Sequence, residues 1–541
     1  MAYTAHIDTF ARDSLPPAEA WPEFLFELPF LQYPARLNCA EVLLDRRIAG
    51  GDAARPALHA WRAGGRVVHR YGELLRHANR IAHVLRRDLG LAPGARVLLR
   101  GPNNPTLVAC WFGVLKAGCI AVTTMPLLRA RELRAIIEQA KVSAALCDVR
   151  LDEELRIAAG ECPDLRHLVC FEDGGRGELE RLAEAHPDAF RNVETAADDV
   201  ALIAFTSGTT GRPKGTIHFH RDVLAMADCF ARECLKPSAD DVCCGTPPLA
   251  FTFGLGSLLA FPMRFGASAV LVERPTPELI LETIQAFRAT TCFTAPTYYR
   301  KMIGLAPGFD LSSLRSCVSA GEALPDATRQ GFKQATGIEL IDGIGSTEMT
   351  HFFISHAPER VRRGATGYAL PGYRATVLDE AGAPCPPGVV GRLAVKGPTG
   401  CRYLADARQR TYVQNGWNLT GDAYRMDEAG YFYYQARTDD MIVSAGYNIA
   451  GPEVETALLE HPAVAECGVV GVPDEERGQV VKAFVVLNSG YEAGDRSARA
   501  LQEHVKAMLA PYKYPRRVQF VRELPRTESG KLQRFRLREE G

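Results

Sequence analysis

Short apolar strands alternate with amphipathic helices along most of this chain, and no other feature restricts its fold as strongly. The apolar residues of 71–90 recur at helical spacing, whereas 96–99 is a short apolar run typical of a buried strand. Strands separated by helices form parallel sheets with helices on their faces, so the pattern predicts an α/β fold. The other elements predicted up to residue 336 are the strands 120–123, 144–147, 168–171, 200–205, 267–272, 291–295 and 316–319, and the helices 107–118, 131–141, 222–234, 277–287 and 325–336.

Beyond residue 364 the pattern changes. Three β-rich pieces separated by glycine and proline, 373–379, 391–396 and 431–435, indicate a small barrel or antiparallel sheet. A compact mixture of strands and helices follows residue 437. We therefore expect an N-terminal domain, 1–438, of α/β layers plus a small β-barrel, and a separate α+β C-terminal lid domain, 439–541. The strands predicted in the lid are 441–444, 465–472, 480–487 and 517–520, and its helices are 452–460 and 498–509.

Charge and apolar content exclude several classes of function. Lys plus Arg total 63 and Asp plus Glu total 64 among 541 residues, so no net field attracts nucleic acid or an anionic membrane. The longest apolar runs, such as 107–115, have about nine residues, whereas a membrane-spanning helix needs ~20. The first residues lack the apolar core of an export signal, and the 15 cysteines show no CxxC spacing. These features predict a cytoplasmic protein without nucleic-acid or membrane partners and leave a homodimer open.

A loop rich in glycine and hydroxyl groups, 206–215, directly follows the predicted strand 200–205. Its glycines let the backbone turn tightly, its hydroxyls add hydrogen-bond donors, and Lys214 adds a positive charge, which suits a triphosphate. The loop is not a Walker A motif, because the Gly-Lys-Ser/Thr ending is missing and Pro213 would obstruct a following helix. An ordinary surface loop is the alternative, although such loops seldom carry this combination of residues.

Five further stretches accompany this loop, and the six occur in one order. Together they resemble the signatures of the adenylate-forming superfamily of acyl-CoA synthetases, peptide-synthetase adenylation domains and luciferases, and the resemblance extends from about residue 40 to 536. It implies that the protein is an acid–thiol ligase that uses ATP, Mg²⁺ and coenzyme A. The five further stretches are 319–324 (SAGEAL), 342–348 (DGIGSTE), 420–422 (TGD), 437–440 (RTDD) with 444–447 (SAGY), and 525–531 (PRTESGK).

The resemblance also assigns roles to individual residues. Lys531 matches the catalytic lysine of adenylation, Lys214 the phosphate-loop lysine, and Glu348 the magnesium ligand. Asp439 takes the position of the hinge between the domains, which implies that the C-terminal lid domain is mobile. The residues implied in binding ATP and CoA are Thr206, Ser207, Gly208, Thr209, Thr210 and Gly211 at the phosphates; Ala320, Gly321, Glu322, Asp342, Gly343 and Ile344 at the adenine; Asp422 and Arg437 at the ribose; Ser444, Gly446 and Tyr447 at the pantetheine of CoA; and Thr347, which is implied in cofactor binding without a more specific place.

Plainer interpretations exist for several of these residues. Gly343 and Gly345 do not start a dinucleotide-binding fingerprint, because Glu348 occupies its third glycine position. Glu348 could form a structural ion pair, and Asp422 and Arg437 could be ordinary surface charges; the shared motif context favours function. The basic C-terminal stretch 511–541 could be a nucleic-acid tail, but it contains a predicted strand and a family signature.

The stretch 248–255 (PLAFTFGL) resembles the acid pocket of benzoate-type CoA ligases. Aromatic walls with small Ala and Gly positions make a flat apolar slot that fits one aromatic ring. Thr252 stands where amino-acid-activating domains need an aspartate, which disfavours an α-amino acid. Together with the opening segment 6–43, the pocket most resembles ligases for 2-aminobenzoate. The predicted substrate-pocket residues are Phe251, Thr252, Phe253, Ala320, Gly345, His351 and Phe352.

The predicted substrate is therefore a small aromatic carboxylic acid, 2-aminobenzoate or benzoate, joined to CoA with release of AMP and pyrophosphate. An alternative keeps the adenylation but loads the acyl group onto a separate carrier protein. A nucleotide-binding scaffold without catalysis is disfavoured, because Lys214, Glu348 and Lys531 are all present.

Overall fold

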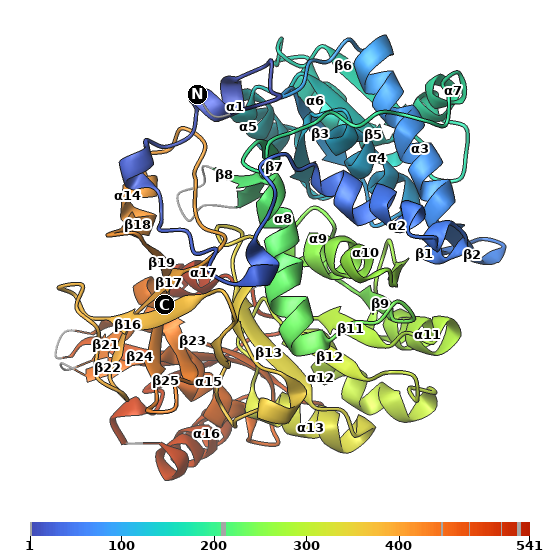
Figure 1. Ribbon diagram of the computed structural model, residues 1–541. Helices are drawn as coiled ribbons and strands as arrows, with labels where there is room; N and C mark the ends of the chain where they lie inside the picture. The colour runs from blue at the N-terminus through green and yellow to red at the C-terminus, as the bar shows by residue number, and fades with distance from the viewer. Residues whose placement is uncertain are drawn as a thin grey trace.

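The computed structural model describes residues 3–206, 213–444, 447–474, 477–509, 511–526 and 532–540. Its larger part contains two β-sheets flanked by helices, and its C-terminal part lies against the second of them (Figure 1). The first sheet has the strand order β6-β5-β3-β4-β7-β8. Its strands run parallel except β8, which pairs antiparallel with β7. They are β3 (Arg96–Arg100), β4 (Ile120–Thr124), β5 (Ala144–Asp148), β6 (His167–Phe171), β7 (Val200–Thr206) and β8 (Lys214–Phe219).

The second sheet has the order β15-β14-β13-β12-β11-β9-β10-β1-β2. Its middle strands, β13 to β1 in that order, run parallel, and antiparallel strands extend it at both edges. The strands are β1 (Pro56–Arg62), β2 (Gly65–Arg70), β9 (Val242–Gly245), β10 (Ser268–Leu271), β11 (Thr291–Thr294), β12 (Ser316–Ser319), β13 (Leu340–Gly345), β14 (Phe352–Ser355) and β15 (Tyr368–Ala369).

Helices cover both sheets and share their cores with them. The helix α4 is buried along its whole length, which explains why its sequence is apolar on every side. One large core joins α3, α4 and α8 to residues of both sheets, so the two sheets form one packed body. The helices of this part include α3 (Tyr71–His83), α4 (Pro105–Lys116), α5 (Ala130–Ala140), α8 (His220–Met226), α9 (Thr252–Leu255), α11 (Pro277–Phe287), α12 (Pro296–Leu305) and α13 (Asp326–Thr336).

The β-rich segment is a five-stranded antiparallel sheet in which β20 pairs with β19. The C-terminal part follows it, with a hairpin, a three-stranded sheet and helices around separate small cores. The elements of the five-stranded sheet are β16 (Arg374–Leu378), β17 (Val390–Lys396), β18 (Val413–Gln414), β19 (Trp417–Met426) and β20 (Phe432–Arg437); those of the C-terminal part are β21 (Ile442–Ser444), β22 (Tyr447–Ile449), α15 (Gly451–Leu459), β23 (Val464–Asp474), β24 (Gly478–Leu487), α16 (Asp495–Met508), β25 (Arg517–Phe520) and α17 (Arg534–Glu539).

Each strand and helix predicted from the sequence is present, most with slightly shifted ends, and the α/β class is confirmed. The predicted helices 71–90 and 222–234 end in wider π-helical turns, at 84–88 and 227–235. Several strands were not predicted, among them β13 and β8; β13 contains two glycines, and β8 contains a lysine and a histidine, which weaken a strand pattern. The 15 cysteines are all free thiols, and 14 of them are buried.

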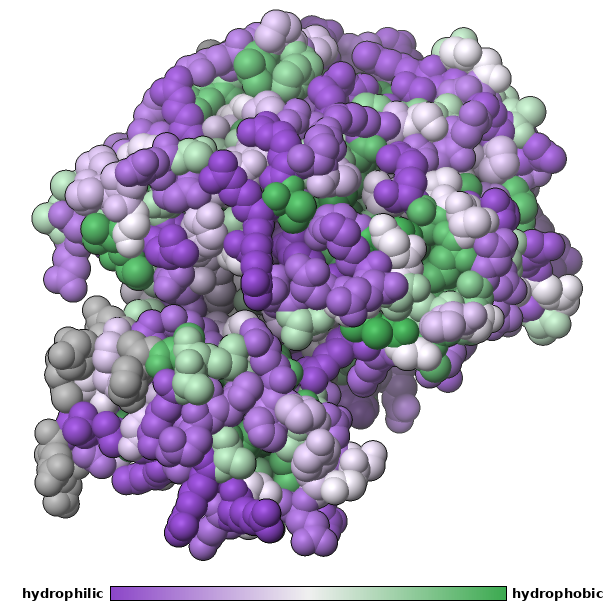
Figure 2. All heavy atoms as spheres, turned by 90° about the horizontal axis from the view of Figure 1, so that it is seen from below, coloured by the Kyte–Doolittle hydropathy of each residue, from purple (hydrophilic) through white to green (hydrophobic). Residues whose placement is uncertain are grey.

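No helix in the described part of the chain combines the length and the apolar character that crossing a bilayer requires. Hydrophilic side chains cover most of the face shown in Figure 2, and the hydrophobic ones are scattered among them.

Candidate active site

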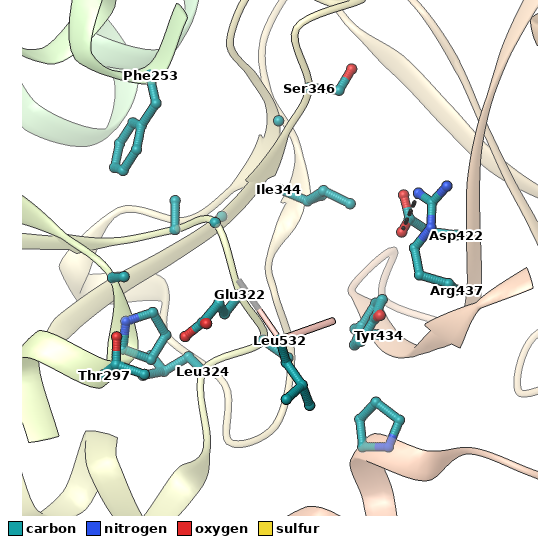
Figure 3. A pocket seen from close by; sticks show the side chains of 18 of the residues that line it. Phe253, Thr297, Glu322, Leu324, Ile344, Ser346, Asp422, Tyr434, Arg437 and Leu532 are labelled. Atoms are coloured by element: carbon teal, nitrogen blue, oxygen red, sulfur yellow. Dashed lines mark hydrogen bonds and ion pairs between the residues drawn. The ribbon is translucent and has the colours of Figure 1, made fainter. Parts of the chain in front are cut away.

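A cavity of about 2350 Å³ opens between the larger part and the C-terminal part of the molecule. Its walls come from strand ends of both large sheets, from β19 and β20, and from α15 and α17. In Figure 3, Phe253 lies on one side of this cavity and the Asp422–Arg437 pair on the opposite side, with Ile344 between them. The cavity is therefore long enough to hold a flat acid at one end and a nucleotide at the other.

The phosphate-loop strands meet at this cavity. Thr206, the last residue of β7, and Lys214, the first residue of β8, are antiparallel partners, and both line the cavity. The segment between them contains the predicted Ser207, Gly208, Thr209, Thr210 and Gly211, which lie outside the described residues. After this segment the chain continues as strand β8 of the same sheet, whereas a Walker A loop leads into a helix.

Glu348 lies on the turn between β13 and β14 and is 9% exposed. The phenol of Tyr403 donates a hydrogen bond of 2.7 Å to its Oε1. The Nζ of Lys214 lies 5.5 Å from the centre of the Tyr403 ring. Burial, and then the charge of Glu348, raises the pKa of Tyr403 far above its usual range, so the phenol is a permanent donor.

This arrangement fits a magnesium ion. In the described part of the chain, no group of three or more His, Cys, Asp or Glu side chains could hold a metal alone. Glu348 supplies one carboxylate that lines the cavity beside Lys214. Mg²⁺ at nucleotide sites uses one or two carboxylates together with phosphate oxygens and water, and the donor set matches that pattern.

The predicted adenine-binding residues come from two neighbouring parallel strands. Ala320, Gly321 and Glu322 follow β12, and Asp342, Gly343 and Ile344 lie on β13, with Ser319 opposite Asp342. All six, together with Thr347, line the cavity. A Cβ on Gly343 would lie 2.8 Å from Cδ1 of Phe352, so glycine is needed there. Burial raises the pKa of the Asp342 carboxyl to about 7, against the opposing effect of Arg329.

Asp422 and Arg437 face each other across β19 and β20. Nη1 of Arg437 lies 3.1 Å from Oδ1 of Asp422 and 3.0 Å from the carbonyl oxygen of Thr420. Gly421 has a φ of 77°, and a Cβ there would lie 2.6 Å from Nη2 of Arg437. The glycine therefore makes room for the guanidinium, and the pair presents a carboxylate to the cavity, as a ribose-binding site requires.

All seven predicted substrate-pocket residues line the cavity. His351 is 3% exposed, and the ring centroids of four phenylalanines lie 4.6 to 5.8 Å from the centroid of its imidazole: Phe230, Phe253, Phe261 and Phe352. Burial lowers the pKa of His351 to about 3, so its imidazole is neutral. The pocket is an aromatic slot without a formal charge from these seven residues.

The C-terminal part closes one side of the cavity. Arg526 forms ion pairs with Glu322 of the larger part, at 3.1 Å, and with Glu466 of its own part, at 2.9 Å. Nη2 of Arg300 on α12 donates to the carbonyl oxygen of Val464 at 3.3 Å. Leu532 lines the cavity. The predicted catalytic Lys531 precedes it and lies outside the described residues.

Of the predicted CoA-binding residues, Ser444 is buried on β21 and is not among the cavity-lining residues, and its backbone pairs with that of Tyr447 on β22. Gly446 lies outside the described residues. The backbone of Asp439 follows β20, and the adjacent Asp440 lines the cavity. A CoA tunnel along Ser444 would therefore need another arrangement of the two parts, and it stays a prediction.

Residues 46–403 match the family model described as AMP-binding enzyme, and residues 453–531 match the model of the AMP-binding enzyme C-terminal domain. The chain belongs to the AMP-binding enzyme family. The curated benzoate–CoA ligase of Thauera aromatica is 36% identical over 519 residues, which cover 94% of this AMP-binding enzyme and 97% of the relative.

Solved structures agree with this membership. An anthranilate CoA ligase in complex with anthranoyl-AMP superimposes on this AMP-binding enzyme with a TM-score of 0.89 and 33% identity, covering 95% of this chain and 99% of the other. A benzoate CoA ligase from Burkholderia xenovorans has a TM-score of 0.84 and 33% identity, covering 93% and 100%.

Three functional candidates in this AMP-binding enzyme were missed from the sequence. Tyr403 contacts Glu348, Arg526 joins the two parts through Glu322, and Tyr434 lines the nucleotide end of the cavity. Arg526 stands inside a recognised stretch, 525–531, so its position was a usable signal. Tyr403 and Tyr434 carry no such signal, because only the tertiary structure brings them to the cavity.

Proposed function

We propose that this protein is an ATP-dependent aryl acid:CoA ligase. The observation that carries this proposal is one continuous cavity with an uncharged aromatic slot at one end and the Asp422–Arg437 pair at the other, with Lys214 and Glu348 also on its wall. The benzoate and anthranilate ligases among its relatives support the same reaction class. The acid we propose is 2-aminobenzoate or benzoate.

The first half-reaction makes an acyl-adenylate. A carboxylate oxygen attacks the α-phosphorus of ATP, the new P–O bond forms, and pyrophosphate leaves with the electrons of the broken bond. Lys214, at the start of β8, holds the phosphates, and Glu348 would hold the magnesium ion. Bound Mg²⁺ supplies neutralisation of phosphate charge. We propose that Lys531 bridges the carboxylate and the α-phosphate, because two anions otherwise repel each other as they approach.

The nucleotide is held by residues that the two large sheets and the small sheet bring together. Asp422 accepts hydrogen bonds from the ribose hydroxyls, and Arg437 orients that carboxylate through their 3.1 Å contact. Ala320, Gly321, Glu322, Asp342, Gly343 and Thr347 surround the adenine, with Ile344 as an apolar platform. Thr206 and the hydroxyls and glycines of 207–211 complete the phosphate site.

In the second half-reaction the CoA sulfur attacks the acyl carbon, and AMP leaves. We propose domains 1–438 and 439–541, with Asp439 as the hinge between them. A rotation at that hinge would bring Ser444, Gly446 and Tyr447 to the adenylate in place of Lys531. The ion pairs of Arg526 with Glu322 and Glu466 support the closed arrangement as the one for adenylation.

The acid pocket supports an aromatic ring with small substituents. Phe251, Phe253 and Phe352 form its aromatic walls, and Ala320 and Gly345 are its small positions. A neutral His351 adds no charge that would draw in an amino acid or a second carboxylate. We place the protein in the cytoplasm, where its 15 free thiols stay reduced.

The test is a panel of aryl acids with ATP and Mg²⁺, read as AMP formation with and without CoA. We expect benzoate and 2-aminobenzoate to give AMP formation that depends on CoA, and aliphatic acids of equal size to react poorly. Acid-dependent pyrophosphate exchange without any effect of CoA would point instead to loading of a carrier protein. A protein that forms no acyl-adenylate from any acid would overturn the proposal.

A further inference from the structure

The strand β8 contacts both the segment that carries Tyr403 and the turn that carries Glu348. Lys214 starts this strand, and the backbone of 402–404 pairs with it: the amide of Ile217 donates to the carbonyl of Arg402 at 2.7 Å, and the amide of Leu404 donates to the carbonyl of Gly215 at 2.8 Å. Thr216 and Tyr403 are bridge partners between these segments. Tyr403 therefore lies at a fixed position relative to β8, the strand that Lys214 starts.

The turn that carries Glu348 is held from the same strand. Thr350 has a φ of 69°, which is strained for a β-branched residue. Its hydroxyl lies 3.0 Å from Nδ1 of His218 on β8, and both residues are buried. The strain persists because this contact and the pairing of β13 with β14 fix the turn.

The side chain of Tyr403 joins the segment 402–404 to Glu348. It is fully buried, its amide donates to Oε1 of Gln409 at 2.9 Å, and its ring packs edge-on against Tyr412 at 5.8 Å. From this fixed ring the phenol donates to Glu348 at 2.7 Å. A hydrogen bond on Oε1 selects one orientation of the carboxylate, and a neutral donor leaves its negative charge intact for a cation.

We infer that Tyr403 is a positioning residue for the metal–nucleotide complex. Its hydrogen bond holds the Glu348 carboxylate in the orientation that binds Mg²⁺, next to the phosphates that Lys214 binds. Tyr403 itself contacts neither the acid nor the reacting phosphorus. This inference rests on the proposed function, since it assumes that the cavity binds ATP with a divalent cation. Loss of such a hydrogen bond to a ligating group typically weakens metal binding or activity ~10- to 100-fold.

The test is Tyr403→Phe, which removes the hydroxyl and keeps the ring. Manganese serves as the probe: free Mn²⁺ is measured by electron paramagnetic resonance during titration of the full-length protein with a non-hydrolysable ATP analogue. We expect Tyr403→Phe to weaken Mn²⁺ binding in the presence of the analogue by ~10-fold or more. Binding of the same analogue without metal, followed by fluorescence, should stay within about twofold of wild type.

Tyr71→Phe is the matched control. Tyr71 is also buried, and its hydroxyl donates to the carbonyl oxygen of Ala267 at 2.7 Å, but Tyr71 does not line the cavity. We expect this variant to titrate with Mn²⁺ as the wild type does. Equal loss of metal-free nucleotide binding in Tyr403→Phe would indicate a general packing defect and would overturn the positioning role.

A double-mutant cycle with Glu348→Gln gives a second, independent measurement. If Tyr403 acts through Glu348, Tyr403→Phe has no further effect on Mn²⁺ binding once the carboxylate is gone. Independent, additive losses would contradict the inference. If the wild-type protein forms AMP in a CoA-dependent way but Tyr403→Phe binds Mn²⁺ normally, the positioning role of Tyr403 is wrong and the proposed function stands. If the wild-type protein forms no acyl-adenylate, the proposed function itself is wrong.

Discussion

Asp422 and Arg437 are opposite each other on β19 and β20, and their charged groups lie 3.1 Å apart at the edge of the cavity. The strand pairing fixes both backbones, and Gly421 leaves space for the guanidinium. The carboxylate is therefore oriented before any nucleotide binds, which lowers the entropic cost of binding.

Asp422→Asn should raise the KM for ATP. The change keeps the shape and removes the charge, and a hydrogen bond to a charged group contributes about 1.5–3 kcal/mol, or roughly 10- to 100-fold. KM for the aryl acid should change little. Steady-state kinetics measures the KM for ATP of each variant. Glu359→Gln is the control, because Glu359 is exposed and pairs with Lys236. Equal KM values for ATP in Asp422→Asn and wild type would contradict the ribose role.

Asp342 should make the protein less stable as the pH rises from about 4 to about 7. Its folded-state pKa of about 7 lies above the usual value of 3.8, so the folded state binds the proton more tightly than the unfolded state. The stabilisation from that proton is complete below pH 4 and is lost as pH approaches 7, by at most about 4 kcal/mol.

Urea unfolding of wild type and Asp342→Asn at pH 5 and pH 8 measures this effect. The amide cannot ionise, so the stability of the variant relative to wild type should increase between the two pH values. A difference between the proteins that is constant with pH would show that Asp342 titrates normally in the folded state.

Gly345→Ala should damage the acid pocket. A Cβ at Gly345 would lie 2.6 Å from the backbone carbon and oxygen of His351, and backbone atoms cannot move aside as a flexible side chain can. We expect a loss of about 1–3 kcal/mol in the free energy of unfolding and a raised KM for the aryl acid. Gly304→Ala is the control, because it lies on α12 with nothing within 4 Å of the added Cβ. Equal free energies of unfolding in urea and equal KM values for the aryl acid in the two variants would contradict this prediction.

Lys531→Ala should slow adenylation and leave thioester formation unchanged. Loss of a preorganised charge at the transition state typically lowers the rate ~10²- to 10³-fold, and only adenylation uses this lysine in the proposed mechanism. Acid-dependent pyrophosphate exchange should fall accordingly, while conversion of a supplied acyl-adenylate and CoA to the thioester should be retained. Lys506→Ala, at a partly exposed site paired with Glu503 on α16, controls for loss of surface charge. Full exchange activity in Lys531→Ala would remove its proposed role.

Local sequence patterns and the order of the motifs were enough to predict the fold class and the family of this protein. The alternation of apolar strands and helices predicted the α/β class, because burial on both faces requires nearly continuous apolar strands such as β3 and β5. Motif order predicted the family, and the predicted acid-pocket residues, such as those of 251–253 and 351–352, come from short stretches that line one cavity.

The tertiary structure alone decided the contacts between distant stretches. Tyr403 and Glu348 are 55 positions apart, and only the pairing of 402–404 with β8 brings the phenol to the carboxylate. The raised pKa of Asp342 likewise follows from burial between strands, which its local sequence does not encode. Sequence patterns report which residue types a segment contains and how often they recur; which side chains meet, and how deeply they are buried, depends on packing between segments far apart in the chain.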